Sequence, residues 1–337
     1  MSEKQHIAVL KGGPSLEHDV SMRSGQGVEE ALDRQVYAVT PVVISREGLW
    51  SFDGSPPMPL AAAAGQFEAR GIDVAFLALH GTFGEDGRVQ GLLDLLGVPY
   101  TGSGCAASAL AMDKVRCKAV VEAQGLRVAG HVALDRPTWA VSAETVRRTV
   151  ADDLGFPCVV KPSAQGSSFG VTIVQDAAGF DAAMEAAFDA GDYVMVEQHV
   201  AGRELTCAVL DADAGGRLRP LPITEIRPKS GAFFDFEAKY TAGACEEITP
   251  AHLDPATAEQ VSEMAAHAHE IVGCAGWSRS DFMLGPDGPV WIEINTIPGL
   301  TPTSLFPQAV AAVGISYGEM VTLLVEDALR RARHEKG

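Results

Sequence analysis

The sequence has no stretch of about 18 consecutive apolar residues, so it predicts no membrane-spanning helix. Its polar start, residues 1–6, runs directly into an apolar strand pattern at residues 7–10 and lacks the apolar core of a secretion signal. We therefore expect a protein that stays in the cytoplasm and does not bind membranes.

Paired cysteines and an excess of positive charge are also lacking. The six cysteines are scattered without a C-x-x-C pair, so we expect reduced, mostly buried thiols and no zinc site. The 26 lysines and arginines against 44 aspartates and glutamates give a net charge of −18, which argues against nucleic acid as a partner. An acidic protein that binds phosphate groups must gather its cations locally, beside glycine loops.

The hydrophobic content of 47% and charged content of 21% are typical of a folded globular protein. The 337 residues suit about two or three packed domains. Residues 1–102 alternate strand and helix patterns, which predicts an α/β layer with a parallel sheet. Strands are expected at 7–10, 36–45 and 72–79, and the alanines at 61–64 are expected in a surface connection.

Residues 103–197 and 198–337 form two further regions. In the first we expect a helix at 106–124, strands at 158–161 and 171–174, a helix near 179–190 and a strand at 193–200. In the second we expect strands at 204–210 and 221–227, a helix at 256–272, a hairpin at 277–296 and a closing helix that begins at Ser316. Ser316 and Glu319 form a capping-box pattern at the start of that helix.

The expected hairpin places polar residues on one face. If Gly285 pairs with Pro289 across a three-residue loop, Asp281 faces Glu293 and Arg279 faces Asn295. Strict alternation also puts Met283 and Trp291 on this face. The other register would bury the carboxylates among apolar side chains at a cost of several kcal/mol, so we expect the first.

Two opposed carboxylates and an amide oxygen indicate a metal ion. Directly opposed residues have Cβ atoms about 5 Å apart, and like charges at that distance repel each other unless a cation lies between them. Oxygen ligands without histidine or cysteine favour Mg²⁺ or Mn²⁺. The alternative is a solvated polar sheet face, which the segment 295–299 after the strand disfavours.

A glycine- and serine-rich loop at residues 159–171 is a candidate phosphate site. The P-loop pattern is absent and the loop leads into a strand, so backbone N–H groups of residues 166–170 would have to surround the phosphates, with Lys161 nearby. An ordinary hairpin turn is the alternative, and Lys161 together with the metal hairpin disfavours it.

With further segments, these residues resemble the D-alanine–D-alanine ligases of the ATP-grasp superfamily. The resemblance is colinear over residues 7–307 and rests on residues 12–21, 79–91, 101–104, 112–114, 161, 166–170, 233–240, 279–282 and 293–299. It implies a Rossmann-like, parallel-sheet α/β domain at 1–102. An α+β, two-lobed ATP-grasp fold would follow, with a central lobe at 103–197 and a C-terminal lobe at 198–337.

The resemblance also implies a reaction. ATP phosphorylates the carboxylate of one D-alanine, the amine of a second D-alanine attacks the acyl phosphate, and phosphate leaves; the product serves peptidoglycan synthesis. Phosphoryl transfer depends mostly on positioning and charge neutralisation, which suits a site of lysines and metal ligands. A homodimer is implied as well.

The resemblance assigns roles to residues of this sequence. ATP would be bound by Lys114, Lys161, Ser168, Glu197, Val200, Glu204, Phe233, Lys239 and Asn295, with Glu197 at the adenine amino group and Glu204 at the ribose. Two Mg²⁺ or Mn²⁺ ions would be bound by Asp281, Glu293 and Asn295. The substrates would be bound by Glu17, His80, Arg279, Gly299, Ser304 and Leu305. Ser167 and Tyr240, hydrogen-bonded with Glu17, would close two loops over the reactants and exclude water.

Alternatives to these roles remain open. Glu17 could be a charge at a helix N-terminus, His80 a buried core histidine, Lys114 part of a solvated helix face and Tyr240 a packing residue. The protein could also be a ligase of this fold that joins other amino acids or hydroxy acids, or an ATP-binding module without catalysis. The resemblance also implies that Arg279 and the N–H of Gly299 stabilise the oxyanion of the tetrahedral intermediate. Arg279 therefore disfavours the module, because ATP binding alone needs no oxyanion donor.

Overall fold

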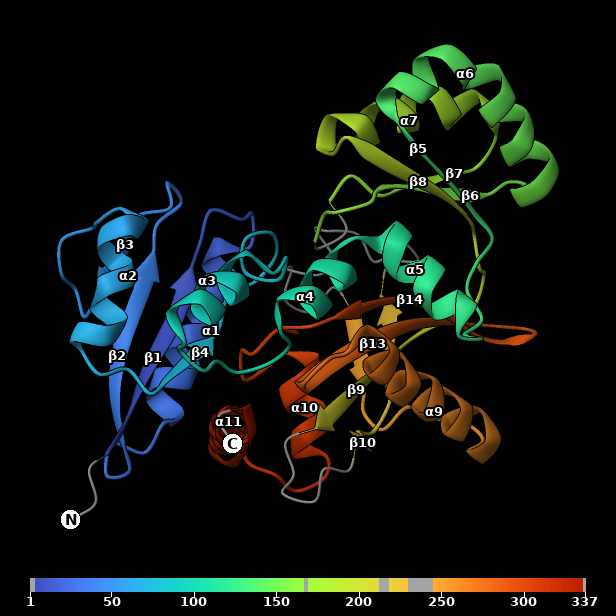
Figure 1. Ribbon diagram of the computed structural model, residues 1–337. Coiled ribbons are helices and arrows are strands. Elements are labelled where there is room, and N and C mark those ends of the chain that lie inside the picture. The colour runs from blue at the N-terminus through green and yellow to red at the C-terminus, as the bar shows by residue number, and fades with distance from the viewer. Residues whose placement is uncertain (1–3, 167–168, 212–217, 230–244, 336–337) are drawn as a thin grey trace.

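Three β-sheets with their helices make up the chain (Figure 1). The computed structural model describes residues 4–166, 169–211, 218–229 and 245–335. In Figure 1 the N-terminal sheet lies on one side, and a central lobe and a C-terminal lobe lie on the other. The predicted combination of an α/β layer and α+β lobes is therefore confirmed.

The N-terminal layer has the strand order β3-β2-β1-β4. It consists of β1 (Gln5–Gly12), α1 (His18–Ala31), β2 (Tyr37–Ile44), β3 (Trp50–Phe52), α2 (Leu60–Ala69), β4 (Val74–Leu77) and α3 (Arg88–Leu96). β1 pairs in parallel with β2 and β4, as predicted, and β3 adds an antiparallel edge. Because parallel strands end at the same edge of a sheet, the loop that carries Glu17 after β1 meets the loop that carries His80 after β4.

The central lobe is an antiparallel sheet of order β5-β8-β6-β7. Its elements are β5 (His131–Asp135), α6 (Arg136–Thr149), a π-helix (Val150–Leu154), β6 (Cys158–Pro162), β7 (Thr172–Val174), a 3₁₀ helix (Ala177–Gly179), α7 (Phe180–Ala190) and β8 (Tyr193–Gln198). Apolar side chains of α6, α7 and the strands form its own core. The glycine loop of the sequence connects β6 to β7.

The C-terminal lobe is also antiparallel, with the order β12-β11-β9-β13-β14 and β10 paired with β9. Its elements are β9 (Arg203–Asp211), β10 (Arg219–Pro220), β11 (Thr224–Pro228), β12 (Cys245–Ile248), α9 (Pro255–Val272), β13 (Gly276–Gly285) and β14 (Gly288–Asn295), followed by α10 (Leu305–Ala311) and α11 (Tyr317–Glu335). The helix α9 packs on this sheet through Val261, Ala265 and Ala268.

The hairpin of β13 and β14 pairs Asp281 with Glu293 and Arg279 with Asn295, as predicted. Its loop is shorter than predicted, because Gly285 pairs with Gly288. A β-bulge after Asp281 supplies the extra residue that restores the predicted pairing at the carboxylates.

The bulge changes the face of Trp291, whose predicted position beside Glu293 and Asn295 is wrong. Trp291 is 1% exposed and packs with Phe282 and Ile294 in the core of the C-terminal lobe. The physical reason is the bulge itself, which interrupts the alternation of faces along β14.

Two helix predictions also need correction. Residues 106–124 form two helices, α4 (Cys105–Met112) and α5 (Lys114–Ala123), because Asp113 is extended and its side chain accepts the N–H of Arg116 as the N-cap of α5. The alanines at 61–64 belong to α2, which buries Ala63 and Phe67 against the sheet, and not to a surface connection.

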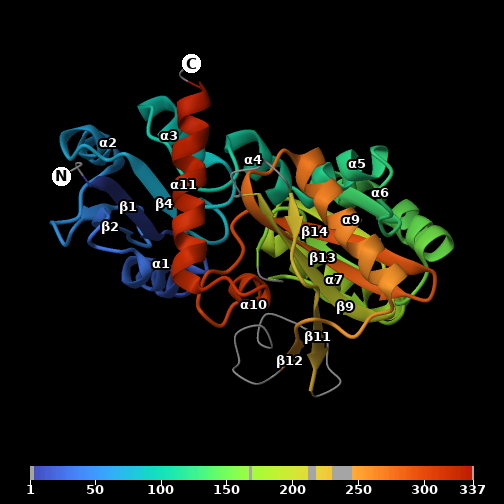
Figure 2. The same ribbon diagram turned by 90° about the horizontal axis from the view of Figure 1, so that it is seen from below.

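The last helix belongs to the first sheet. Met320, Leu324 and Val325 of α11 share one core with β1 and β4, and Figure 2 shows α11 beside these strands. The predicted capping box is confirmed, since Ser316 N–H donates to Glu319 Oε2 at 2.8 Å and Glu319 N–H donates to Ser316 Oγ at 3.3 Å.

One tryptophan joins the N-terminal layer to the C-terminal lobe. Trp277 of β13 stacks on Phe76 of β4 with ring centroids 6.3 Å apart and on Phe306 of α10 at 6.4 Å. This packing fixes the β1 and β4 loops relative to the hairpin of β13 and β14. In the part of the chain that the structure describes, none of the helices has the length and apolar character needed to cross a bilayer.

Candidate active site

A cavity of about 850 Å³ lies where loops of the three sheets meet. Most of the predicted site residues line it: Glu17, His80, Lys114, Glu204, Arg279, Asp281, Glu293, Asn295, Gly299, Ser304 and Leu305. Lys161, Glu197 and Val200 lie outside this lining. Ser167, Ser168, Phe233, Lys239 and Tyr240 lie outside the described residues.

Each carboxylate of the hairpin lies beside a cation. Arg279 donates to both oxygens of Asp281, from Nε and from Nη2, at 2.8 Å each. Burial disfavours the charge of Arg279, but Asp281 outweighs this effect and holds the arginine pKa above its usual value. Lys114 Nζ lies 3.3 Å from Glu293 Oε2. The like charges of Asp281 and Glu293 are therefore balanced within the cavity.

The donor set of the hairpin fits a hard cation. The opposed carboxylates lie at the surface of the cavity, and Asn295 Nδ2 donates to Asp281 Oδ2 at 3.3 Å, which leaves the amide oxygen as a further ligand. Among the described residues, no three side chains of His, Cys, Asp or Glu are grouped as a metal site. A cation at the hairpin would thus need the amide oxygen, water or phosphate oxygens besides the two carboxylates, as Mg²⁺ commonly does.

Lys114 connects the hairpin to the glycine loop. Its Nζ donates to the carbonyl of Gln165 at 2.7 Å while it lies beside Glu293, and its side chain is 13% exposed. The backbone N–H of Lys114 also donates to Ser163 at 3.0 Å. These contacts rule out a solvated helix face, since the side chain is enclosed between the glycine loop and β14.

Glu197 lies in a buried cluster with two lysines, one of which the sequence did not reveal. Lys161 contacts its Oε2, and Lys118 of α5 contacts its Oε1. Burial would raise the pKa of Glu197, but Lys161 and then Lys118 outweigh it and lower the pKa to about 2. Lys118 could have been suspected, because it follows Lys114 by one helical turn and shares its face.

Glu17 is the N-cap residue of α1, yet its carboxylate lies close against glycines of two other loops. A Cβ at Gly81 would come to 2.5 Å of Glu17 Oε2, and a Cβ at Gly166 to 2.6 Å. The side chain makes no capping hydrogen bond. Glu17 thus lies at the junction of the β1 loop, the β4 loop and the glycine loop.

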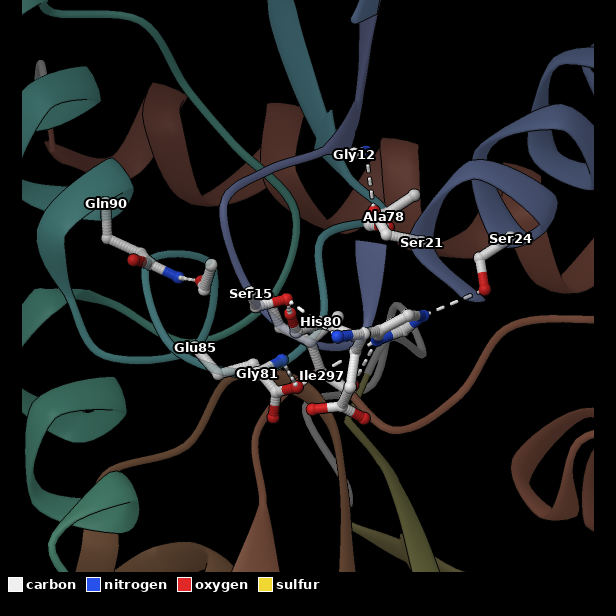
Figure 3. Close-up of polar contacts among 12 residues, drawn as sticks. Gly12, Ser15, Ser21, Ser24, Ala78, His80, Gly81, Glu85, Gln90 and Ile297 are labelled. Atoms are coloured by element: carbon white, nitrogen blue, oxygen red, sulfur yellow. Dashed lines mark hydrogen bonds and ion pairs between the residues drawn. The ribbon is translucent and has the colours of Figure 1, made fainter. Parts of the chain in front are cut away.

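His80 is buried between three segments, and Figure 3 shows its ring between Ser24 and Ile297. Burial lowers its pKa, and the charge of Glu17 only partly opposes this effect, so the ring is neutral near pH 7. Because a carbonyl can only accept, Nδ1–H donates to Ile297 O at 3.2 Å, and Nε2 then accepts from Ser24 Oγ at 2.8 Å. His80 therefore combines a cavity-lining position with the hydrogen bonds of a core histidine.

Glu85 is an acidic residue of the cavity that the sequence did not single out, although it lies within the segment 79–91. Its Oε1 accepts the N–H of Gly81 at 2.8 Å and lies 3.9 Å from His80 Nδ1 (Figure 3). Burial, followed by the charge of Glu17, raises its pKa to about 8. Nothing in the spacing of the sequence indicates this burial.

We expect Glu85→Gln to stabilise the protein increasingly as the pH rises. The folded pKa of Glu85 is above its ordinary value, so its contribution to stability is complete below about pH 4.5 and is lost between about pH 4.5 and 8. A neutral glutamine removes this loss, which is on the order of 4 kcal/mol at pH 8. Melting temperatures at pH 5, 6, 7 and 8 test it, with exposed Glu144→Gln as control. Parallel curves for variant and wild type would contradict the expectation.

Gly299 and Ser304 close the cavity at the start of α10. A Cβ at Gly299 would lie 2.9 Å from Ser304 Oγ, so the hydroxyl lies directly against the glycine backbone. Ser304 Oγ is also 2.7 Å from Thr301 Oγ1. Leu305 follows as the first residue of α10. Gly299 and Ser304 therefore line the same cavity as the carboxylates of the hairpin.

A cavity lined by Lys114, opposed carboxylates and a glycine loop, beside two antiparallel lobes, defines an ATP-grasp type of site. Family models described as D-ala D-ala ligase N-terminus and C-terminus match residues 6–61 and 53–103 and residues 120–326. A D-alanine–D-alanine ligase of Desulfotalea psychrophila is 42% identical over 339 residues, which cover 100% of this chain and 98% of that protein. The chain belongs to the D-alanine–D-alanine ligase family.

Solved structures agree with this membership. The D-alanine–D-alanine ligase of Bacillus anthracis complexed with ATP has a TM-score of 0.80 and 30% identity, and the match covers 98% of this chain and 99% of that chain. The VanG D-Ala:D-Ser ligase of Enterococcus faecalis has a TM-score of 0.82 and 30% identity, with 97% and 100% covered.

Proposed function

We propose that the protein joins two D-alanines to D-alanyl-D-alanine at the expense of ATP, through a D-alanyl phosphate, for peptidoglycan synthesis. The observation that carries this proposal is the meeting of Glu17, Arg279 and Glu293 in one cavity, from segments far apart in the sequence. This ligation requires an acidic residue that binds an ammonium group, a cation that stabilises an oxyanion and a ligand for the metal that binds the phosphates. The near-complete match to a D-alanine–D-alanine ligase supports the choice of substrate.

The cluster positions suggest how ATP lies in the site. Lys114 is beside the metal hairpin and the glycine loop, so we place the phosphates there. Glu197 of β8 is paired with Lys161 of β6, and we place adenine at that end of the site. Val200, which follows β8, would also contact ATP there, and Glu204 of β9 would bind the ribose. The two ends of the nucleotide then correspond to two carboxylates that each face a lysine of α5.

Asp281, Glu293 and Asn295 would hold Mg²⁺ or Mn²⁺, two ions by the family resemblance, which neutralise phosphate charge when bound. Arg279 donates to both oxygens of Asp281 and so holds its carboxylate in a fixed orientation for this role. In the transfer, a carboxylate oxygen of D-alanine bonds to the terminal phosphorus of ATP and ADP leaves. The amine of the second D-alanine then bonds to the carbonyl carbon, loses a proton, and phosphate leaves.

The remaining residues would bind and orient the substrates. Glu17 would pair with the ammonium group of the first D-alanine, and neutral His80 would hold the loops around it. Arg279 and the N–H of Gly299 would stabilise the oxyanion that develops as the amine attacks. Ser304, beside Leu305, would take the carboxylate of the second D-alanine, together with Lys239.

Loop closure would exclude water from the acyl phosphate, which water would otherwise hydrolyse. We propose that Ser167 and Tyr240 hydrogen-bond with Glu17 in the closed state, with Ser168 and Phe233 against ATP. The contact between Glu17 and Gly166, next to Ser167 in the chain, supports this arrangement.

The second substrate is the main alternative, because one structural relative is a D-Ala:D-Ser ligase. Relatives that are 41% and 42% identical over nearly the whole chain are D-alanine–D-alanine ligases, which supports D-alanine as the amine. We further propose a homodimer located in the cytoplasm, where ATP is available, which sedimentation and fractionation would test.

A substrate panel tests the proposed function. We expect phosphate release from ATP with D-alanine and Mg²⁺, with D-alanyl-D-alanine as the product identified by mass spectrometry. D-serine and D-lactate, added with one equivalent of D-alanine, should give mixed products at rates at least about tenfold lower. Phosphate release with L-alanine or L-glutamate but not with D-alanine would contradict the proposal.

A further inference from the structure

Lys118 is completely buried, although it belongs to no role described so far. It lies on α5 with 0% exposure, and its Nζ contacts Glu197 Oε1. Lys161 contacts the other oxygen of the same carboxylate. Each carboxylate oxygen of Glu197 therefore contacts a lysine, although a single lysine would be enough to neutralise its charge.

A second buried lysine is costly. Removing an ammonium group from water costs several kcal/mol even when it is paired, and one carboxylate can neutralise only one of two lysines. Lys118 is 0% exposed, compared with 5% for Lys161, so it is enclosed more completely and is not placed to bind the phosphates itself. A structural explanation alone would require only Lys161 and Glu197.

The two lysines differ in whether their side chains can move toward ATP when it binds. Lys161 is the residue before Pro162, where β6 ends and the chain enters the glycine loop, and is expected to turn to a phosphate oxygen when ATP binds. Lys118 is enclosed on α5 and cannot follow. We propose that Lys118 is a positioning residue that keeps Glu197 charged and oriented as the acceptor of the 6-amino group of adenine while Lys161 binds phosphate. Lys118 would thereby set the preference for adenine over 6-oxopurine nucleotides.

The chemistry of the two bases explains the selectivity. A carboxylate only accepts hydrogen bonds, so it pairs with the amino group of adenine and repels the 6-oxo oxygen of inosine or guanine nucleotides. A glutamic acid that is protonated or rotated can donate to that oxygen instead. Without Lys118, both the attraction to ATP and the rejection of ITP should weaken. This inference rests on the proposed placement of adenine at Glu197.

Lys118→Met tests the inference through the ratio of kcat/KM for ATP to that for ITP, measured with D-alanine and Mg²⁺. We expect the ratio to fall at least about tenfold through KM, with kcat at saturating ATP changed less than about twofold. Glu197→Gln should lower the ratio similarly, and Lys118→Met in the Glu197→Gln background should add nothing, because Lys118 acts through Glu197. Lys118→Gln, which keeps a donor, serves if the methionine variant does not fold.

Lys11→Met is the matched control, because Lys11 is a buried lysine paired with Glu29 outside the cavity and should leave the ratio unchanged. Equal losses for ATP and ITP, or additive effects of the two substitutions, would overturn the inference. The affinities for ATP and ITP, measured by calorimetry without D-alanine, separate the role of Lys118 from the proposed ligation of D-alanine. A wild type that prefers ATP but does not ligate D-alanine contradicts the proposed function alone, whereas an unchanged preference in Lys118→Met contradicts only the role of Lys118.

Discussion

Glu293→Gln should lower kcat for D-alanine-dependent phosphate release by at least about a thousandfold while the protein stays folded. The substitution keeps the size of the side chain and removes one of the two charges that face each other across the hairpin. It also takes the anionic partner from Lys114, whose Nζ lies 3.3 Å away. Phosphoryl transfer depends on charge neutralisation at this point, so few other contacts can compensate.

The folded state should tolerate this change. Glu293 and Asp281 repel each other when no metal ion is bound between them. The loss of that repulsion offsets the loss of the contact with Lys114. We expect a melting temperature within about 4 °C of wild type, measured with EDTA present. Added Mg²⁺ should raise the melting temperature of the wild type more than that of the variant.

Glu29→Gln is the matched control, because Glu29 is also paired with a lysine but lies outside the cavity. It should keep near-normal turnover. If Glu293→Gln retained near-normal activity as well, the assignment of the hairpin as the metal site would be wrong.

Arg279→Lys should be the second large loss, about a hundredfold or more in kcat, with little change in the KM for ATP. Arg279 donates to both oxygens of Asp281, and a lysine cannot reproduce this planar, two-bond geometry. The proposed oxyanion would lose its donor, and a single preorganised donor is worth about 10²–10³ in kcat.

The chain offers a control with the same geometry. Arg147 also makes two hydrogen bonds to one aspartate, Asp181, at 2.8 and 2.7 Å, but on the exposed side of the central lobe. Arg147→Lys should leave kcat unchanged within about twofold. Equal losses in both variants, or an effect of Arg279→Lys confined to the KM for ATP, would exclude the oxyanion role.

The sequence predicted the features that depend on local pattern. Alternating strands and helices gave the parallel layer, and the alternation of side chains in the hairpin gave the pairing of Asp281 with Glu293. The loop of the hairpin was predicted one residue too long, and the bulge after Asp281 compensated for this difference at the carboxylates. The error remains on the loop side of the bulge, where the pairs from Phe282 to Gly285 are shifted by one residue and Trp291 packs in the core.

Other features depend on contacts between distant segments and could not be predicted in this way. Glu85 and Lys118 have ordinary sequence surroundings, and their burial follows from the loops and strands that fold over them. Asp113 divides two helices because its side chain caps α5, whereas the helical pattern on either side suggested one continuous helix. The contacts of Lys114 with Gln165 and Glu293 likewise join residues far apart in the sequence.

The position of α11 has a consequence for synthesis on the ribosome. The strands β1 and β4 emerge early, but part of the apolar core they share is supplied by residues of α10 and α11, which emerge last. Domains usually fold as they leave the ribosome, beginning with the N-terminal one. Here part of the apolar face of the N-terminal layer stays uncovered until α10 and α11 have left the ribosome, so its need for chaperones should last until then.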